Sequence, residues 1–157
     1  MVLQQDPVED FAKECARLNV QSVDLADPKE WPVYKKYGLV PTMIGGGTTI
    51  SDGFNRKENH EGIAARFRES VDRGIENGAP SIIVFSGNRR GMSDEEGLEN
   101  CVIGLKQVMP LAEDKNLLVC MELLNSKVGP QGLHVRSHQV GRRVGEAGWI
   151  AKLQTAV

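Results

Sequence analysis

A carboxylate and a group of polar side chains each follow an apolar stretch in the second half of the chain. Glu122 closes the stretch 117–122, and Asn88, Arg89 and Arg90 follow an earlier apolar stretch. A carboxylate can transfer protons in a reaction or bind a hard divalent cation. An arginine can hold a substrate carboxylate through two parallel hydrogen bonds. These residue types predict acid–base and binding chemistry where the two stretches end.

Three further side chains are candidates for substrate contact. Asn125 and Lys127 lie just beyond Glu122, where they would bind a carboxylate or position a partner, or form an ordinary solvated turn. His60 stands at the entry to a helical segment and could hydrogen-bond a substrate oxygen, or act as a cap or an exposed residue.

Glu122 and the two arginines also have purely structural interpretations. Glu122 would then be a salt-bridged or capping residue at the end of a strand. One of Arg89 and Arg90 would pack against a helix end while the other is solvated.

These residues need elements to position them, and the chain alternates between two patterns. Helical spacing of apolar residues alternates with short apolar or β-branched stretches, which is typical of a parallel sheet covered by helices. In such sheets the chemistry gathers at the carboxyl ends of the strands. A closed barrel and an open doubly wound sheet both fit, and the polar loops that follow the strands favour the barrel. Strands are predicted at 20–25, 39–44, 81–85 and 117–123.

Helix starts and stops support this order. Asp6-Pro7 and Asp27-Pro28 are start signals, and Ser93 with Glu96 forms a capping box. Asn19, Gly38 and Gly78 are predicted stops, and Pro110 should kink or end the last helix. Gly45-Gly46-Gly47 opens a long polar loop, interpreted as a mobile lid rather than an anion cradle.

The composition excludes several classes of protein. The chain has 157 residues, a net charge of −2 and 25% charged residues, which suits one domain with its own core and no nucleic-acid partner. It contains no apolar stretch long enough to cross a membrane and no signal peptide at its start. Cys15, Cys101 and Cys120 are interpreted as buried thiols, which predicts a cytoplasmic protein.

The composition changes sharply near position 128. Residues 1–127 hold 15 basic and 20 acidic side chains, a net of −5, whereas residues 128–157 hold four basic residues against one Glu, a net of +3. Five glycines and no capping signals mark the second segment, and no element is predicted in it. We therefore expect residues 1–127 to form an α/β unit and 128–157 an irregular tail.

Long strings in the first segment resemble a known family. SGNRRGMSDEEGLENCVIGLK at 86–106 and CMELLNSKV at 120–128 resemble the hydroxypyruvate isomerase family, within the xylose isomerase-like TIM-barrel superfamily. DPKEWPVYKKYGL at 27–39 and SDGFNRKENH at 51–60 add to the match, which covers roughly residues 6 to 128.

The resemblance implies a partial (β/α)8 barrel with about four parallel strands and flanking helices. It implies isomerisation of hydroxypyruvate to tartronate semialdehyde, a small hydroxy-oxo acid, with Mg or Mn as cofactor. Glu122 would be both a metal ligand and the acid–base catalyst. The substrate contacts would be Asn88, Arg89, Arg90, His60, Asn125 and Lys127.

This chain departs from the family pattern at both ends. The family has a strand before the helix at Asp6, and after Glu122 it has three more strands that carry the other metal ligands and a second glutamate. Read one base out of phase with plausible codons, residues 132–157 become AFMYDRTKWGVELAKRVGSPNFKLLY, which looks like the family's next helix and strand. The hypothesis is therefore that the segment from about 129 onward is a frameshift product, and that this chain alone is inactive.

Two other interpretations remain open. The chain could be a non-catalytic half-barrel that associates with itself through open sheet edges. It could also be a DNA-repair endonuclease of the same superfamily. The charge of residues 1–127 and the lack of a histidine-rich cluster there weigh against the endonuclease.

Overall fold

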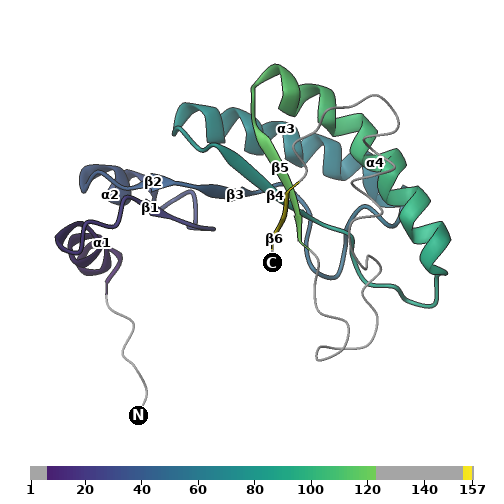
Figure 1. Cartoon of the computed structure of the whole chain (residues 1–157), viewed down its shortest axis with the longest axis horizontal. Helices are drawn as coiled ribbons and strands as arrows, with labels where there is room; N and C mark the ends of the chain where they lie inside the picture. Colours follow the sequence, from purple (N-terminus) through teal and green to yellow (C-terminus); the bar gives the residue numbers. More distant parts are fainter. Residues whose placement is uncertain (1–6, 123–153, 157) are drawn as a thin grey trace, which may run out of the picture.

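The computed structural model describes residues 7–122 and 154–156, in which helices alternate with parallel strands (Figure 1). A 3₁₀ turn at Lys57–Asn59 precedes the third helix. In chain order the elements are α1 (Val8–Arg17), β1 (Ser22–Val23), α2 (Trp31–Lys36), β2 (Val40–Pro41), β3 (Met43–Gly45), α3 (His60–Glu76), β4 (Ser81–Phe85), α4 (Asp94–Asp114), β5 (Leu118–Glu122) and β6 (Gln154–Ala156).

The strands form two parallel sheets, β1-β2 and β3-β4-β5-β6. The predicted strand 39–44 is present but is divided between them, because β2 pairs with β1 whereas β3 pairs with β4. Thr42 joins the two sheets. Its N–H donates to the Val23 carbonyl (3.1 Å), and its carbonyl accepts from the Ser81 hydroxyl (2.6 Å).

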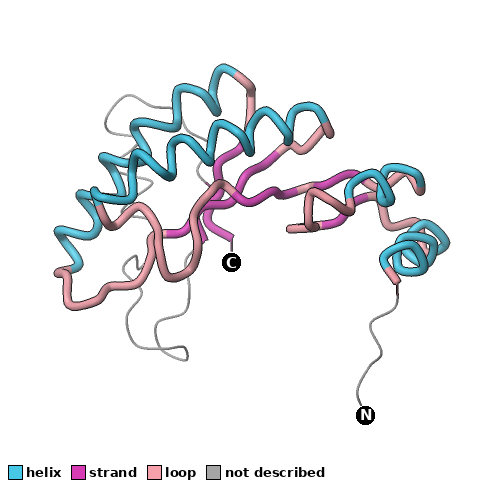
Figure 2. The backbone as a smooth tube through the Cα atoms, turned by 180° about the vertical axis from the view of Figure 1, so that it is seen from behind, coloured by secondary structure: helices cyan, strands magenta, loops and turns pink. Residues whose placement is uncertain are grey.

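The helices α3 and α4 lie together over one face of β3–β5 (Figures 1 and 2). Side chains alternate between the two faces of a strand. In β4, Ile82 and Val84 belong to the helix-facing core, and in β5 Val119 and Met121 do so. All four are almost completely buried. The opposite face of the sheet therefore carries the alternate residues of these strands, with Glu122 last in β5.

Local signals place most helix boundaries. Ser93 caps α4 as predicted, since its Oγ accepts a hydrogen bond from the Glu96 N–H (3.1 Å). Gly38 and Gly78 follow α2 and α3 with φ angles of +77° and +76°, in the left-handed region that glycine adopts without strain. Pro110 does not end α4, which continues to Asp114.

Two helix starts differ in detail from the sequence prediction. The Asp27 carboxylate accepts from the Lys29 N–H (3.0 Å), and the turn this forms delays the start of α2 to Trp31. Asp6, the predicted cap of α1, lies outside the described residues, and α1 begins after Pro7. Trp31 is 5% exposed and Tyr34 6%, so both side chains pack in the core.

One strand was not predicted. The sequence pattern gave no element after Lys127, whereas β6 pairs in parallel with β5 through Cys120, Met121 and Glu122. The proposed boundary at 127/128 and the out-of-phase origin of the tail stay predictions. Within the described part of the chain, no helix is both long enough and apolar enough to cross a membrane.

Candidate functional site

Two loops at the carboxyl ends of β3 and β4 are joined by backbone hydrogen bonds. We call residues 46–56 and 86–93 the mouth loops; Figure 1 shows both at the end of the sheet where α4 begins. Their pairing continues the parallel sheet beyond the strands and gives the edge a fixed backbone. The bonds run from Gly46 N to Ile83 O (2.8 Å), Phe54 N to Phe85 O (3.2 Å), Asn55 N to Ser86 O (2.8 Å) and Asn88 N to Ser51 O (3.1 Å).

Glycines allow this close approach. A Cβ placed on Gly53 would lie 2.3 Å from the Phe85 carbonyl oxygen, and one on Gly87 would lie 2.6 Å from the Gly53 nitrogen. A Cβ on Gly46 would also meet β4, 2.7 Å from the Ile83 carbonyl oxygen. Gly46 is thus fixed against β4, a packing that differs from the freely moving lid interpreted from the Gly45-Gly46-Gly47 sequence.

Two buried asparagines hold the mouth loops to each other and to α4. Asn55 is 1% exposed, and its Nδ2 donates to the Asn88 carbonyl (2.8 Å). Asn100, on α4 and 4% exposed, donates from its Nδ2 to the Asn55 carbonyl (2.9 Å). The sequence analysis missed both residues. The available signal was an amide at Asn100 next to Cys101, on the apolar face of a helix.

His60 lies in the core rather than with the arginines of the mouth. It is 4% exposed, and its Nε2 is 2.8 Å from the Phe54 carbonyl oxygen. A Cβ on Gly104 of α4 would lie 2.7 Å from the same nitrogen, so the imidazole fills the space between α3 and α4. The structure therefore gives His60 a role in fixing the Phe54 backbone, and its predicted contact with substrate gains no support from this position.

Arg89 and Arg90 both lie on the second mouth loop with exposed side chains. The Arg89 Nε donates to the Met92 carbonyl (2.9 Å), and its guanidinium pairs with Asp94 at the start of α4 (3.1 Å). Arg90 has a φ of +43° and pairs across the loops with Asp52 (3.0 Å). Arg89 thus contacts a helix end and Arg90 is solvated, as one structural interpretation expected, and Arg90 also forms an exposed ion pair with Asp52.

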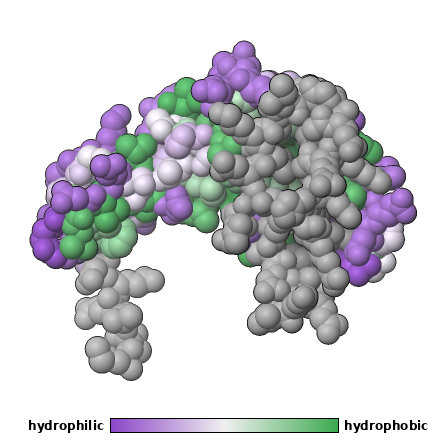
Figure 3. All heavy atoms as spheres, in the orientation of Figure 1, coloured by the Kyte–Doolittle hydropathy of each residue, from purple (hydrophilic) through white to green (hydrophobic). Residues whose placement is uncertain are grey.

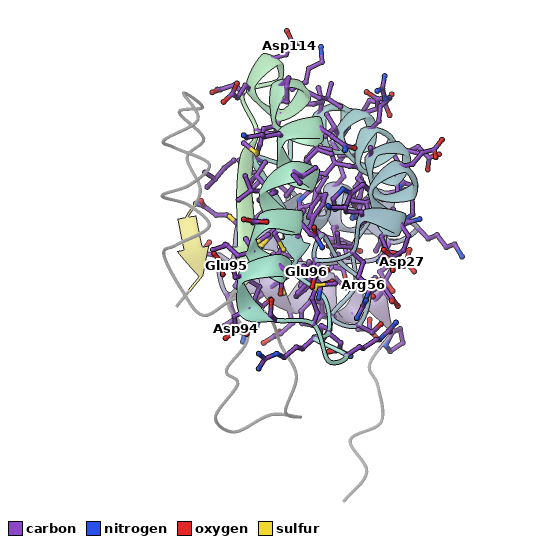
Figure 4. The ribbon with its side chains drawn as sticks, turned by 90° about the vertical axis from the view of Figure 1, so that its right-hand side faces the viewer. Asp27, Arg56, Asp94, Glu95, Glu96 and Asp114 are labelled. Carbon is purple, nitrogen blue, oxygen red and sulfur yellow. The ribbon has the colours of Figure 1, made fainter. Side chains whose placement is uncertain are left out.

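Acidic side chains gather at the start of α4 near these arginines. Figure 4 shows Asp94, Glu95 and Glu96 at one end of α4 and Asp114 at the other. Carboxylates in the first turn favour the helix through its dipole. Exposed ion pairs such as Arg89–Asp94 contribute only about 0–1 kcal/mol, so either arginine can exchange its partner for a substrate carboxylate at little cost.

Glu122 ends β5 directly beside Phe85, the last residue of β4. It is half-buried, and because Met121 faces the helices, Glu122 points to the opposite face of the sheet. The structure therefore brings Glu122 to the same sheet edge as the loop that carries Asn88, Arg89 and Arg90. Asn125 and Lys127 lie outside the described residues.

The described residues do not form a metal site by themselves. Within residues 7–122 and 154–156, no group of three or more His, Cys, Asp and Glu side chains is placed to hold an ion. Mg²⁺ needs several oxygen ligands, and Glu122 supplies one. A metal bound at this edge would need ligands beyond those described.

The buried thiols are not suited to nucleophilic chemistry. Cys15, Cys101 and Cys120 are free and buried. Burial raises the pKa of the Cys101 thiol to about 12 and raises that of the Cys120 thiol as well. Cys101 and Cys120 are therefore protonated at neutral pH.

No family model and no curated protein matches the sequence. Several solved structures match the fold. A family 2 AP endonuclease from Brucella melitensis has a TM-score of 0.74 at 11% identity, covering 99% of this chain and 64% of that one. 3-keto-D-glucoside 4-epimerase from E. coli has a TM-score of 0.68 at 14% identity, and the match covers 99% of this chain and 64% of that one. A xylose isomerase domain containing protein from Salmonella typhimurium has a TM-score of 0.65 at 17% identity, and the match covers 96% of this chain and 55% of that one.

These similarities show the fold. The chain is an α/β structure that matches part of a TIM barrel, which confirms the predicted fold class. It spans 64% or less of the length of these three proteins. The matched proteins include an AP endonuclease and a 3-keto-D-glucoside 4-epimerase by name, so the fold leaves the reaction open.

Proposed function

We propose that this chain carries part of the active site of an isomerase that acts on a small hydroxy-oxo acid of the hydroxypyruvate type. The observation that carries the proposal is the position of Glu122 at the carboxyl end of β5, on the face away from the helices. Asn88, Arg89 and Arg90 stand on the neighbouring mouth loop. The resemblance of residues 86–106 and 120–128 to hydroxypyruvate isomerases supports the choice of substrate.

Each group has a defined task in this reaction. Hydroxypyruvate becomes tartronate semialdehyde in two proton transfers. The hydroxyl proton moves from the hydroxymethyl oxygen to the carbonyl oxygen, and a carbon-bound proton leaves the hydroxymethyl carbon and is returned to the adjacent carbonyl carbon. Glu122 takes and returns the carbon-bound proton as the acid–base group, and such groups typically contribute a rate factor of about 10²–10⁴. Arg89 or Arg90 holds the substrate carboxylate, and the Asn88 amide donates to a substrate oxygen.

The cofactor and the second glutamate of the family are not accounted for by the described residues. A divalent ion, Mg or Mn, would stabilise the negative charge on the substrate oxygens when bound. Glu122 would be one ligand of this ion, and the described residues contain no group of three His, Cys, Asp or Glu side chains that could hold it. We propose that the 157-residue chain alone does not turn over, and that a reading frame corrected near codon 128 restores the missing groups.

A non-catalytic half-barrel is the alternative. In the described residues neither sheet closes, so β1 and β2 are the edges of one sheet and β3 and β6 are the edges of the other. Open parallel edges favour self-association. A monodisperse monomer in size-exclusion chromatography would contradict this alternative.

The fold similarity to an AP endonuclease, with a TM-score of 0.74, is the reason to assay DNA cleavage as well. The net charge of −5 in residues 1–127 disfavours a phosphate backbone as partner. We propose instead a cytoplasmic enzyme without a nucleic-acid or membrane partner, a location that the free cysteines support.

The test compares the chain as printed with a frame-corrected version. Each is purified and assayed with hydroxypyruvate and Mg²⁺ or Mn²⁺, and then with DNA that contains an abasic site. We expect turnover of hydroxypyruvate by the corrected protein and none by the 157-residue chain. Turnover by the 157-residue chain near that of an intact homologue would refute its inactivity. Cleavage of abasic DNA without isomerisation would refute the proposed reaction.

A further inference from the structure

A pocket lies on the helix side of the sheet, away from Glu122. Its volume is about 480 Å³, within the range of small-molecule sites. Trp31 of α2 lines one side, Ser70 and Arg73 of α3 line the other, and Ile44 of β3 lies between them. Ile44 belongs to the helix-facing core, so this pocket and Glu122 are on opposite faces of the sheet.

Ser70 contributes a hydroxyl to the lining of this pocket. It is 7% exposed, although it stands on a helix where its neighbours Phe67 and Val71 are completely buried in the core. The Ser70 side chain makes no hydrogen bond with any residue in 7–122 or 154–156. The Ser70 Oγ is not among the fully buried unpaired atoms of the described residues, so it is open to the pocket and available to a ligand there.

Arg73 and Asp27 carry opposite charges and line the pocket without forming an ion pair with each other. The Arg73 guanidinium forms no ion pair with a carboxylate in the described part of the chain, Asp27 included. Asp27 instead accepts from the Lys29 N–H (3.0 Å), which fixes its carboxylate at the start of the turn before α2. A molecule between them can pair an anionic group with Arg73 and give a hydrogen bond to Asp27.

Trp31 supplies a fixed apolar surface beside these charges. Its indole N–H donates to the Ala26 carbonyl (3.1 Å), and the side chain is 5% exposed. The ring therefore has one orientation, and Leu25 and Ile44 extend the apolar lining. A short carbon chain fits against these three residues better than a highly charged ion would.

We propose that this pocket binds a small organic acid that carries a hydroxyl or ammonium group. Its carboxylate pairs with Arg73, a second oxygen bonds to the Ser70 hydroxyl, and its donor group bonds to Asp27. The carbon skeleton lies against Trp31. This site is independent of the proposed isomerase reaction, because none of its residues is assigned to that reaction.

Trp31 allows a direct test in the full chain. The sequence has two tryptophans, Trp31 and Trp149. A Trp149→Phe background therefore reports on Trp31 alone, and its fluorescence is followed during titration with D-glycerate, L-serine or glycerol. We expect a saturable change with glycerate or serine, and none with glycerol, which lacks a carboxylate.

Variants locate the bound molecule. Arg73→Gln should weaken the apparent Kd by about tenfold or more, since a charged hydrogen bond is lost. Ser70→Ala should weaken it by a smaller factor, and Arg68→Gln on the same helix should leave it unchanged because Arg68 does not line the pocket. Far-UV circular dichroism of each variant verifies the fold.

Three results would overturn the inference. The first is no saturable change with glycerate or serine up to about 10 mM, a concentration at which even weak specific sites fill. The second is an equal Kd for Arg73→Gln and the parent. The third is loss of binding in Glu122→Gln, which would place the ligand on the other face of the sheet.

Discussion

The two ends of the described structure are held together in different ways. The region from α3 to β5 is built on completely buried side chains such as Phe67 and Leu105. In the N-terminal unit, from α1 to β2, Phe11 is 48% exposed and Leu18 58%. Figure 3 shows hydrophobic surface at the end of the molecule where α1 lies. Stability is therefore concentrated in the region that carries the mouth loops.

The contact between α1 and α2 illustrates the difference. Glu9 of α1 accepts hydrogen bonds from the Lys36 ammonium and the Tyr37 hydroxyl, both at 2.7 Å, on an exposed surface. Regions with few buried contacts open at lower free energy than the core does. We thus expect the N-terminal unit to open first, while Glu122 and the mouth loops stay in place.

The largest predicted effect compares one phenylalanine from each region. Phe67→Ala should lower the free energy of unfolding by about 3–5 kcal/mol, because it empties a fully buried position. Phe11→Ala removes a half-exposed ring that packs edge-on against Tyr34, and should cost about 1 kcal/mol or less. Urea unfolding followed by circular dichroism gives both values. Equal losses would contradict the comparison.

The next effect tests the close approach of the mouth loops. Gly53→Ala places a Cβ against the Phe85 carbonyl, and should cost about 1–3 kcal/mol through forced backbone shifts. Gly45→Ala is the matched control, since a Cβ there has no atom within 4 Å. Thermal unfolding of the two variants measures the difference. A Gly53→Ala protein as stable as Gly45→Ala would show that the loops are not packed together.

A similar or smaller loss is expected at the asparagine that links α4 to the mouth. Asn100→Ala removes the bond to the Asn55 carbonyl and should cost about 1–3 kcal/mol. Hydrogen exchange at the Asn55 and Asn88 amides should also become faster. Asn77→Ala, which removes a bond to the Arg73 carbonyl at the far end of α3, should leave both exchange rates unchanged. Unchanged exchange in Asn100→Ala would argue against its role in holding the loops.

The smallest effect concerns pH and the N-terminal unit. Hydrogen bonds from Lys36 and Tyr37, with the charge of Lys36, lower the pKa of Glu9 from 4.5 to about 2. Because the folded pKa lies below the unfolded one, this contribution is fully present above about pH 4.5. It is lost as the pH falls toward about 2. The melting-temperature difference between the parent and Glu9→Gln should therefore shrink over that window; a constant difference would contradict the lowered pKa.

The sequence predicted elements wherever local chemistry decides them. The apolar stretch 81–85 is β4 with both bounds as expected, and Ser93 caps α4 through the bond that its spacing predicted. The division of strand 39–44 at Thr42 depends on two different neighbours, so no local pattern indicates it.

The candidate site was predicted less completely for the same reason. Glu122, Asn88, Arg89 and Arg90 were predicted as site residues because they follow apolar stretches. The pairing of Arg90 with Asp52 and the bond from Asn100 to the Asn55 carbonyl join residues 38 and 45 positions apart. His60 was predicted as a site residue because of its residue type. Its burial depends instead on the packing of α3 against Gly104 of α4. Such contacts follow from tertiary structure and not from spacing.

The most direct test of the account is the turnover of hydroxypyruvate by the frame-corrected protein with and without its carboxylate. We predict that Glu122→Gln lowers kcat by about 10²–10⁴, the contribution typical of a general acid–base group. Glu113→Gln, an exposed glutamate on α4, should keep the parent rate. A Glu122→Gln enzyme that turns over as fast as Glu113→Gln would contradict the central claim.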